Sequence, residues 1–270
     1  MYSGSTFRTK SGRLMGVHQR IDRIARRHVR RYVPSSVHFP TTRDILHFEG
    51  KNGPDGIKRK NPGVDEPWHF IDPYHKGDHE LFDMITDHIL NLGVALKEKN
   101  EERAAFEAAW LAHAIVDGLT PAHHYPMEEK LEELRGEGLE TRVSKKDKLV
   151  MPGATRRHQL RNNWEFWGAK GVMTTHIAFE LGVASSIATL RFDDIAISDQ
   201  ELVDVRAGKY IDIYQQLLGS IAEMDMYKEF SRVGWTRHLA SETKNTLMPL
   251  IIKAVVLGWY AAVGIAEETA

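Results

Sequence analysis

A histidine and an aspartate four residues apart, His113 and Asp117, constrain the fold of this chain more than any other pair. They lie in an apolar run, so in a helix their side chains share one face, about 5–6 Å apart at Cβ. Pro121 cannot continue that helix, and Gly118 favours its end. The chain can therefore turn just after Asp117 and bring His123 back to the same helix end. Two imidazoles and one carboxylate gathered there have the donor atoms of a nitrogen and oxygen metal site.

The same spacing recurs downstream, where His176 and Glu180 are again four residues apart inside an apolar helical pattern. One such pair alone is equally consistent with a buried hydrogen bond, a helix cap or a metal site. A buried carboxylate is costly, however, unless it is paired or bound to a cation. Two pairs on core-facing stripes therefore favour a metal cluster over surface decoration.

Charge is distributed unevenly along a chain whose net charge is only −1. Residues 1–60 hold 14 Lys or Arg against 4 Asp or Glu. Such a basic region suits a phosphate-bearing partner or a membrane surface, and a solvated helix face explains it equally well. The chain has no cysteine, which excludes disulfides and thiolate metal sites.

The first 30 residues contain no apolar run behind a short basic segment, so we see no secretory signal. The best transmembrane candidate, residues 246–266, contains Pro249 and Lys253. We interpret it as a buried C-terminal helix, and we expect a cytoplasmic protein.

Apolar periodicity predicts an all-α fold in a single domain that spans residues 1–270. The helices that the pattern predicts span residues 13–31, 78–99, 101–117, 127–135, 172–190 and 246–266, with a further helix that begins at Ser198. Asp78 is the expected N-cap of the second helix, and Ser198 and Glu201 form a capping box. Residues 33–77 show little periodicity and are predicted to be a long irregular segment. A charged insertion is expected at about 125–171.

Three further residues are candidate ligands with an ordinary alternative. His18 lies on the apolar face of the first helix, where a core histidine is more common than a ligand. Asp55 lies in a Pro-Asp-Gly sequence that is typical of a turn. His69 lies between Trp68 and Phe70 and is expected to be buried. Another set has ligand spacing but falls at a charged helix start, where we expect it to be exposed and without metal: His75, His79 and Asp83.

Taken together, these motifs resemble those of the zinc-dependent phospholipase C / P1 nuclease superfamily. The central motif of that superfamily is H-x3-D-x5-H with a proline two residues before the last histidine, which matches His113, Asp117, Pro121 and His123. The H-x3-E motif of the phospholipase branch matches His176 and Glu180, where the nuclease branch typically has aspartate. An upstream His-Phe-x-Asp-Pro segment matches residues 69–73, and the loop aspartate and early helical histidine match Asp55 and His18.

The resemblance implies two zinc ions, with a third possible, and a ligand set for each. One zinc would be held by Asp55, His69, His113 and Asp117. A second would be held by His123, His176 and Glu180. A third would take His18 and share Asp117. The superfamily completes this third set with the amino group of an N-terminal tryptophan, and no tryptophan precedes His18 here.

The resemblance also implies an activity. We expect a zinc-dependent phosphodiesterase that is phospholipase C-like and cleaves a phospholipid headgroup with a zinc-activated water, with Asp55 as the general base. The residues that shape a choline pocket in one secreted phospholipase correspond to Gly56 and Glu66, so choline selectivity is not expected. A single-strand nuclease of the P1 type and a non-catalytic scaffold stapled by metal are the alternatives. The nuclease would need aromatic residues near the metals to stack on bases, for which Trp68, Trp164 and Trp167 are candidates.

Overall fold

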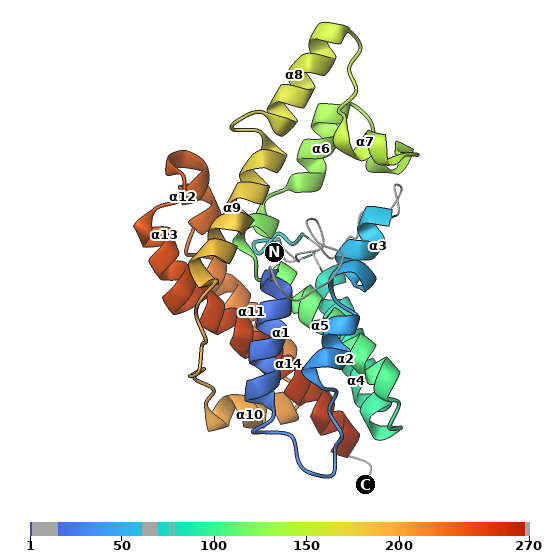
Figure 1. The fold of residues 1–270 in the computed structure, drawn as a ribbon, viewed down its shortest axis with the longest axis vertical. Coiled ribbons are helices and arrows are strands. Elements are labelled where there is room, and N and C mark those ends of the chain that lie inside the picture. Colours follow the sequence, from blue (N-terminus) through green and yellow to red (C-terminus); the bar gives the residue numbers. More distant parts are fainter. Residues whose placement is uncertain (2–15, 61–69, 76, 78, 268–270) are drawn as a thin grey trace.

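The protein is all-α, as predicted, in a computed structural model that describes residues 1, 16–60, 70–75, 77 and 79–267 (Figure 1). No strand occurs within those residues. The helices are α1 (Val17–Val29), α2 (Thr42–His47), η1 (Gly50–Asn52), α3 (Pro54–Lys60), α4 (Glu80–Lys97), α5 (Glu101–Gly118), η3 (Pro121–His124), α6 (Met127–Arg135), η4 (Leu139–Thr141), α7 (Lys145–Leu149), α8 (Arg156–Trp167), α9 (Val172–Ile187), α10 (Asp199–Arg206), α11 (Tyr210–Ala222), α12 (Met226–Val233), α13 (Arg237–Glu242), η5 (Thr243–Leu247) and α14 (Met248–Glu267).

The C-terminal helix α14 runs through the middle of the molecule and packs against α1, α4 and α5 (Figure 1). Trp259 on its buried face is wholly enclosed, and its indole nitrogen donates to the Ala108 carbonyl oxygen of α5 at 2.9 Å. Within the described residues, one helical stretch, Arg237–Glu267, is long and apolar enough to cross a membrane by length and composition. Most of its apolar window is buried inside the protein, which is also the pattern of a core helix.

The end of α5 is shaped by a glycine that no other residue could replace without movement. The helix ends at Gly118, and a Cβ added there would lie 2.1 Å from the Tyr214 hydroxyl oxygen and 2.3 Å from Leu81 Cδ2. After this close contact the chain turns, and η3 begins at Pro121. The predicted turn that returns His123 to the end of α5 is therefore confirmed.

The prediction of one long irregular segment at residues 33–77 was partly wrong. The structure has α2, η1 and α3 between residues 42 and 60. These helices are too short to show an apolar period, but α2 carries a local signal, because Thr41 and Asp44 form a capping box. The helix α4 begins at Glu80 with His79 as its N-cap residue, and the predicted cap Asp78 lies outside the described residues.

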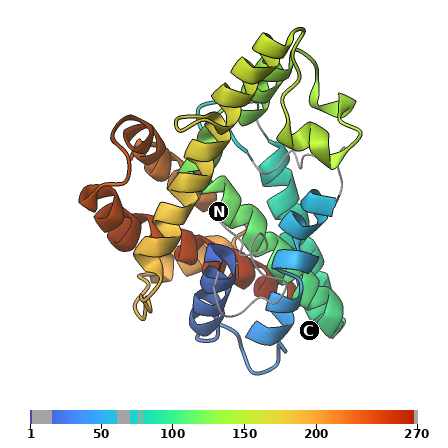
Figure 2. The same ribbon diagram turned by 45° about the horizontal axis from the view of Figure 1, so that its top comes forward.

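Residues 125–167 form a projecting lobe that contains α6, α7 and α8. Figures 1 and 2 both show it at the opposite end of the molecule from the C-terminal end of α1. The lobe has a small core of its own, which consists of Met127, Leu131, Leu134, Met151 and Phe166. Its chain leaves the body of the protein just after His123 and returns through α9, which carries His176.

Candidate metal centre

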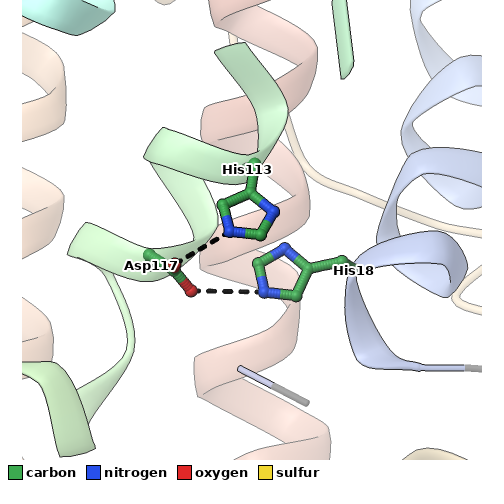
Figure 3. A group of neighbouring side chains, drawn as sticks. All are labelled: His18, His113 and Asp117. Atoms are coloured by element: carbon green, nitrogen blue, oxygen red, sulfur yellow. Dashed lines mark ion pairs between the residues drawn. The ribbon is translucent and has the colours of Figure 1, made fainter. Parts of the chain in front are cut away.

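The first group of candidate ligands joins α1 to the end of α5 (Figure 3). Asp117 lies between two histidines, with its Oδ2 3.1 Å from His113 Nε2 and its Oδ1 3.2 Å from His18 Nε2. The two imidazoles stack with centroids 4.2 Å apart. All three side chains are buried, and one donor atom from each lies within 4.8 Å of the others.

The second group joins η3 to α9. Glu180 Oε1 lies 3.3 Å from His123 Nε2 and 3.2 Å from His176 Nε2. The two imidazoles stack with centroids 5.2 Å apart, and Phe70 packs beside both of them. This group also offers one donor atom from each residue within 4.8 Å of the others.

The two groups are adjacent because Asp117 also approaches His123. The distance from Asp117 Oδ1 to His123 Nδ1 is 3.5 Å. The Asp117 carboxylate faces His18, His113 and His123, so it joins two groups that could each hold a metal ion.

The α-amino group of Met1 is buried at the same junction. Its nitrogen lies 2.6 Å from Asp117 Oδ1 and 3.4 Å from Glu180 Oε1. Burial alone would lower the pKa of this amino group, but the carboxylates of Asp117 and Glu180 outweigh burial and raise the pKa to about 10. An ammonium ion therefore provides a positive charge between the two acidic residues of the centre.

Two other predicted ligands have different outcomes. Asp55 Oδ1 lies 4.0 Å from His113 Nε2, and its side chain is 21% exposed at the rim of the first group. It belongs to the first turn of α3, so the turn that its Pro-Asp-Gly sequence suggested is the start of a helix. His69 lies outside the described residues.

Two further buried carboxylates, which were not predicted from the sequence, lie near His113. Glu49 Oε1 lies 3.1 Å from His113 Nδ1, the ring nitrogen that faces away from Asp117. Burial raises the pKa of the Asp22 carboxyl, and the nearby Glu49 carboxylate raises it further. Asp22 follows His18 by four residues on α1, so the spacing that selected His113 and Asp117 was also present here. No such pattern marks Glu49.

The chemistry of these residues fits a metal centre. Among the described residues, His18 Nδ1 and His176 Nδ1 make no hydrogen bond, and the contact of His18 Nε2 with Asp117 is an ion-pair contact without hydrogen-bond geometry. Burial opposes charge on His113, but Asp117 and Glu49 outweigh burial and hold the pKa of His113 well above its usual value. Burial also opposes charge on Glu180, but the Met1 ammonium and His176 hold the pKa of that carboxyl well below its usual value. The centre thus favours positive charge, and its donors are nitrogen and oxygen, as zinc sites without cysteine use.

Two pockets lie along the segment that follows His123, because His124, Tyr125 and Pro126 line both of them. The first, of about 320 Å³, includes three tyrosine rings, those of Tyr74, Tyr125 and Tyr227. The second, of about 280 Å³, begins at Phe70 beside His123 and His176, and it is acidic. The acidic residues that line the second pocket are Asp72, Glu80, Glu128 and Glu129.

The set that was expected to be exposed, His75, His79 and Asp83, is exposed, as predicted. The structure brings together a different surface set, Glu229, His238 and Glu242. The imidazole of His238 is largely exposed, and its closest carboxylate oxygens lie 3.8 and 4.0 Å away. Exposed groups at such distances are ordinary ion pairs.

Comparisons with known proteins found no matching family model, no matching curated protein and no matching solved structure.

Proposed function

We propose that this protein is a metal-dependent phosphodiester hydrolase that cleaves a phospholipid headgroup, as the phospholipase C branch does. The observation that carries the proposal is the 3.5 Å approach of Asp117 to His123, which joins two three-residue donor groups into one centre. Paired cations at such a centre polarise a phosphoryl oxygen and provide a nucleophile at neutral pH.

The candidate ligands form one set for each of two cations. His18, His113 and Asp117 would hold one cation, and His123, His176 and Glu180 would hold the other. The Met1 amino group can add a nitrogen ligand once it loses its proton, because it already lies against Asp117. This would supply the amino ligand that the superfamily takes from an N-terminal tryptophan.

Asp55 is the proposed general base. Its carboxylate is the partly exposed acid at the rim of the first group, so attacking water can reach it. A positioned base of this kind takes the proton from water as the bond to phosphorus forms. Glu49 is a positioning residue, because its contact with His113 Nδ1 leaves Nε2 directed at Asp117.

The pockets favour a lipid headgroup over nucleic acid as the substrate. The pocket that includes Phe70, whose ring packs beside His123 and His176, is lined by four acidic residues, which repel a polyanion and suit a cationic headgroup. Trp164 and Trp167 lie on α8 in the lobe, and neither lines either of these two pockets. A nuclease would therefore have to stack bases on the tyrosines of the first pocket or on Trp68, which is outside the described residues.

The test uses zinc-loaded protein with two substrates, mixed phosphatidylcholine and phosphatidylethanolamine vesicles and single-stranded DNA. We expect release of phosphorylated headgroup, loss of this activity in Asp55→Asn, and little cleavage of DNA. Rapid cleavage of DNA without headgroup release would show a nuclease. Full zinc binding without cleavage of either substrate would show a metal-stapled scaffold.

A further inference from the structure

The outer side of α8 carries apolar residues that the fold does not cover. Leu160 and Trp164 are 73% and 71% exposed, and Trp167 is also exposed. They follow one another at i, i+4 and i+7, so they form one stripe along the helix. The inner side is held by Asn162, which donates to two backbone carbonyl oxygens of the lobe, and by the buried Phe166.

A fourth exposed apolar residue lies next to the end of this stripe. The indole nitrogen of Trp167 donates to the backbone oxygen of Leu149 at 2.6 Å, which holds the end of α7 against the end of α8. Leu149 is itself exposed. We call Leu149, Leu160, Trp164 and Trp167 the apolar stripe of the lobe.

The lobe separates its charges, and the stripe lies in the basic part. Residues 142–171 contain eight Lys or Arg and two Asp or Glu, whereas residues 125–141 contain two and six. Three exposed arginines lie on the same side of α8 as the stripe or directly beside it: Arg156, Arg157 and Arg161. Tryptophan and leucine flanked by arginine are typical of helices that lie in the interface of a membrane.

We propose that the apolar stripe and the arginines beside it dock the protein on an anionic phospholipid bilayer. The aromatic rings and leucines would enter the boundary between headgroups and acyl chains, and the arginines would pair with lipid phosphates and anionic headgroups. Single-stranded nucleic acid also uses arginine and stacked aromatic rings. Leucine side chains such as those of Leu149 and Leu160 are not part of that mode of recognition, however, whereas the boundary between headgroups and acyl chains accommodates them directly.

The other basic region of the chain fits a membrane less well. On α1, Arg20, Arg26 and Arg27 donate to backbone carbonyl oxygens of neighbouring segments, so these charges hold the fold together. The C-terminal end of α1 lies at the opposite end of the molecule from α8 (Figure 1). One bilayer therefore cannot engage both ends at once.

Docking through the lobe would attach to the bilayer the helix α8, which packs against α9 of the candidate metal centre. The helix α9 starts at Val172, shortly after Trp167, and it carries His176 and Glu180 in its first turns. The supply of lipid substrate to the metal centre by this route rests on the proposed function, whereas the binding of the lobe to a bilayer does not.

The test is co-sedimentation of the full chain with vesicles of phosphatidylcholine, with or without about one third phosphatidylserine. One variant combines Leu160→Ser and Trp164→Ser, and a second combines Arg156→Glu, Arg157→Glu and Arg161→Glu. The matched controls are Val203→Ser with Val233→Ser, which are 60% and 55% exposed outside the lobe, and Arg30→Glu with Arg31→Glu at the far end of α1. Circular dichroism and melting temperature verify that every variant is folded.

We expect the protein to bind the anionic vesicles, both lobe variants to bind about tenfold or more weakly, and both controls to bind as the parent does. Equal binding by parent and lobe variants, or loss of binding in the Arg30 and Arg31 control alone, would overturn the proposal. An absence of vesicle binding would also overturn the proposal. This holds even if the lobe variants lose affinity for single-stranded DNA or for a second copy of the chain, because the surface would then have a different partner.

A soluble phosphodiester separates this inference from the proposed function. If both hold, the lobe variants lose turnover on vesicles and keep it on the soluble substrate. Vesicle binding without hydrolysis of any diester would contradict the proposed function alone. Hydrolysis of the soluble diester without vesicle binding would contradict the docking surface alone.

Discussion

His113 Nδ1 and Glu49 Oε1 lie 3.1 Å apart in the interior, although 64 residues separate them in the chain. Both side chains are buried, and the opposite ring nitrogen of His113 faces Asp117. A carboxylate behind a ligand histidine fixes the tautomer and orientation of the imidazole and raises its basicity. Under the proposed function, Glu49 therefore orients His113 so that Nε2 can bind a cation.

Glu49→Gln should weaken metal binding while the fold is kept. Removal of such a supporting carboxylate typically lowers metal affinity about 10–100-fold, and competition with a zinc chelator measures the change. The matched control is Glu107→Gln, because Glu107 is also buried against a histidine, His88, away from the centre. If both variants lose the same affinity, the effect belongs to general stability and Glu49 has no specific role.

The helices that build the centre could be predicted from the sequence, because their signals are local. The apolar periods of α5 and α9 and the break at Pro121 predicted the two histidine and carboxylate pairs and the return of His123. The capping box at Ser198 was confirmed at the start of α10. The N-terminal boundaries of α1 and α4 differed from the prediction because the apolar pattern does not identify the first turn of a helix.

The partners that complete the centre could not be predicted, because they depend on tertiary contacts. Glu49 lies in a stretch of short helices without periodicity, and no local sequence pattern predicts its contact with His113. The Met1 amino group reaches Asp117 across 116 positions of the chain. Asp22 had the same spacing from His18 as Asp117 has from His113, but a single apolar stripe did not distinguish a ligand face from ordinary core.

Gly118→Ala tests the close contact that ends α5. The new methyl group would overlap the Tyr214 hydroxyl and Leu81, and such overpacking costs about 1–3 kcal/mol of unfolding free energy. Urea denaturation measures it. Gly219→Ala on α11 is the control, because its Cβ would meet no atom within 4 Å and alanine favours a helix. A Gly118→Ala protein as stable as the control would mean that Tyr214 can move aside without cost.

Asp55→Asn and Asp117→Asn should fail in different ways. Asp55 lies at the rim, so we expect its amide variant to retain metal and lose turnover by about 10²–10⁴. Asp117 faces Met1 and three histidines, so its variant should lose metal and about 3–5 kcal/mol of stability. Bound zinc, melting temperature and rate are measured for both. Near-normal turnover in Asp55→Asn would show that Asp55 is not the general base and has only a structural role in the first turn of α3.

The Met1 amino group should make the stability of metal-free protein depend on alkaline pH. Its pKa rises from 8.0 to about 10 on folding, so its contribution is complete below pH 8.0 and is lost as the pH rises through about 10. We expect the melting temperature to fall over that interval, and to fall less in Asp117→Asn, which lacks the closest carboxylate. Parallel curves for the two proteins would show that other groups cause the decline.

Addition of zinc to metal-free protein, with hydrolysis of a soluble phosphodiester followed at each step, tests the two-cation centre most directly. The adjacent donor groups that meet at Asp117 and His123 predict about two bound equivalents, with turnover that appears as the second one binds. Fewer than about one equivalent bound, or both sites filled without hydrolysis, would contradict a catalytic metal centre.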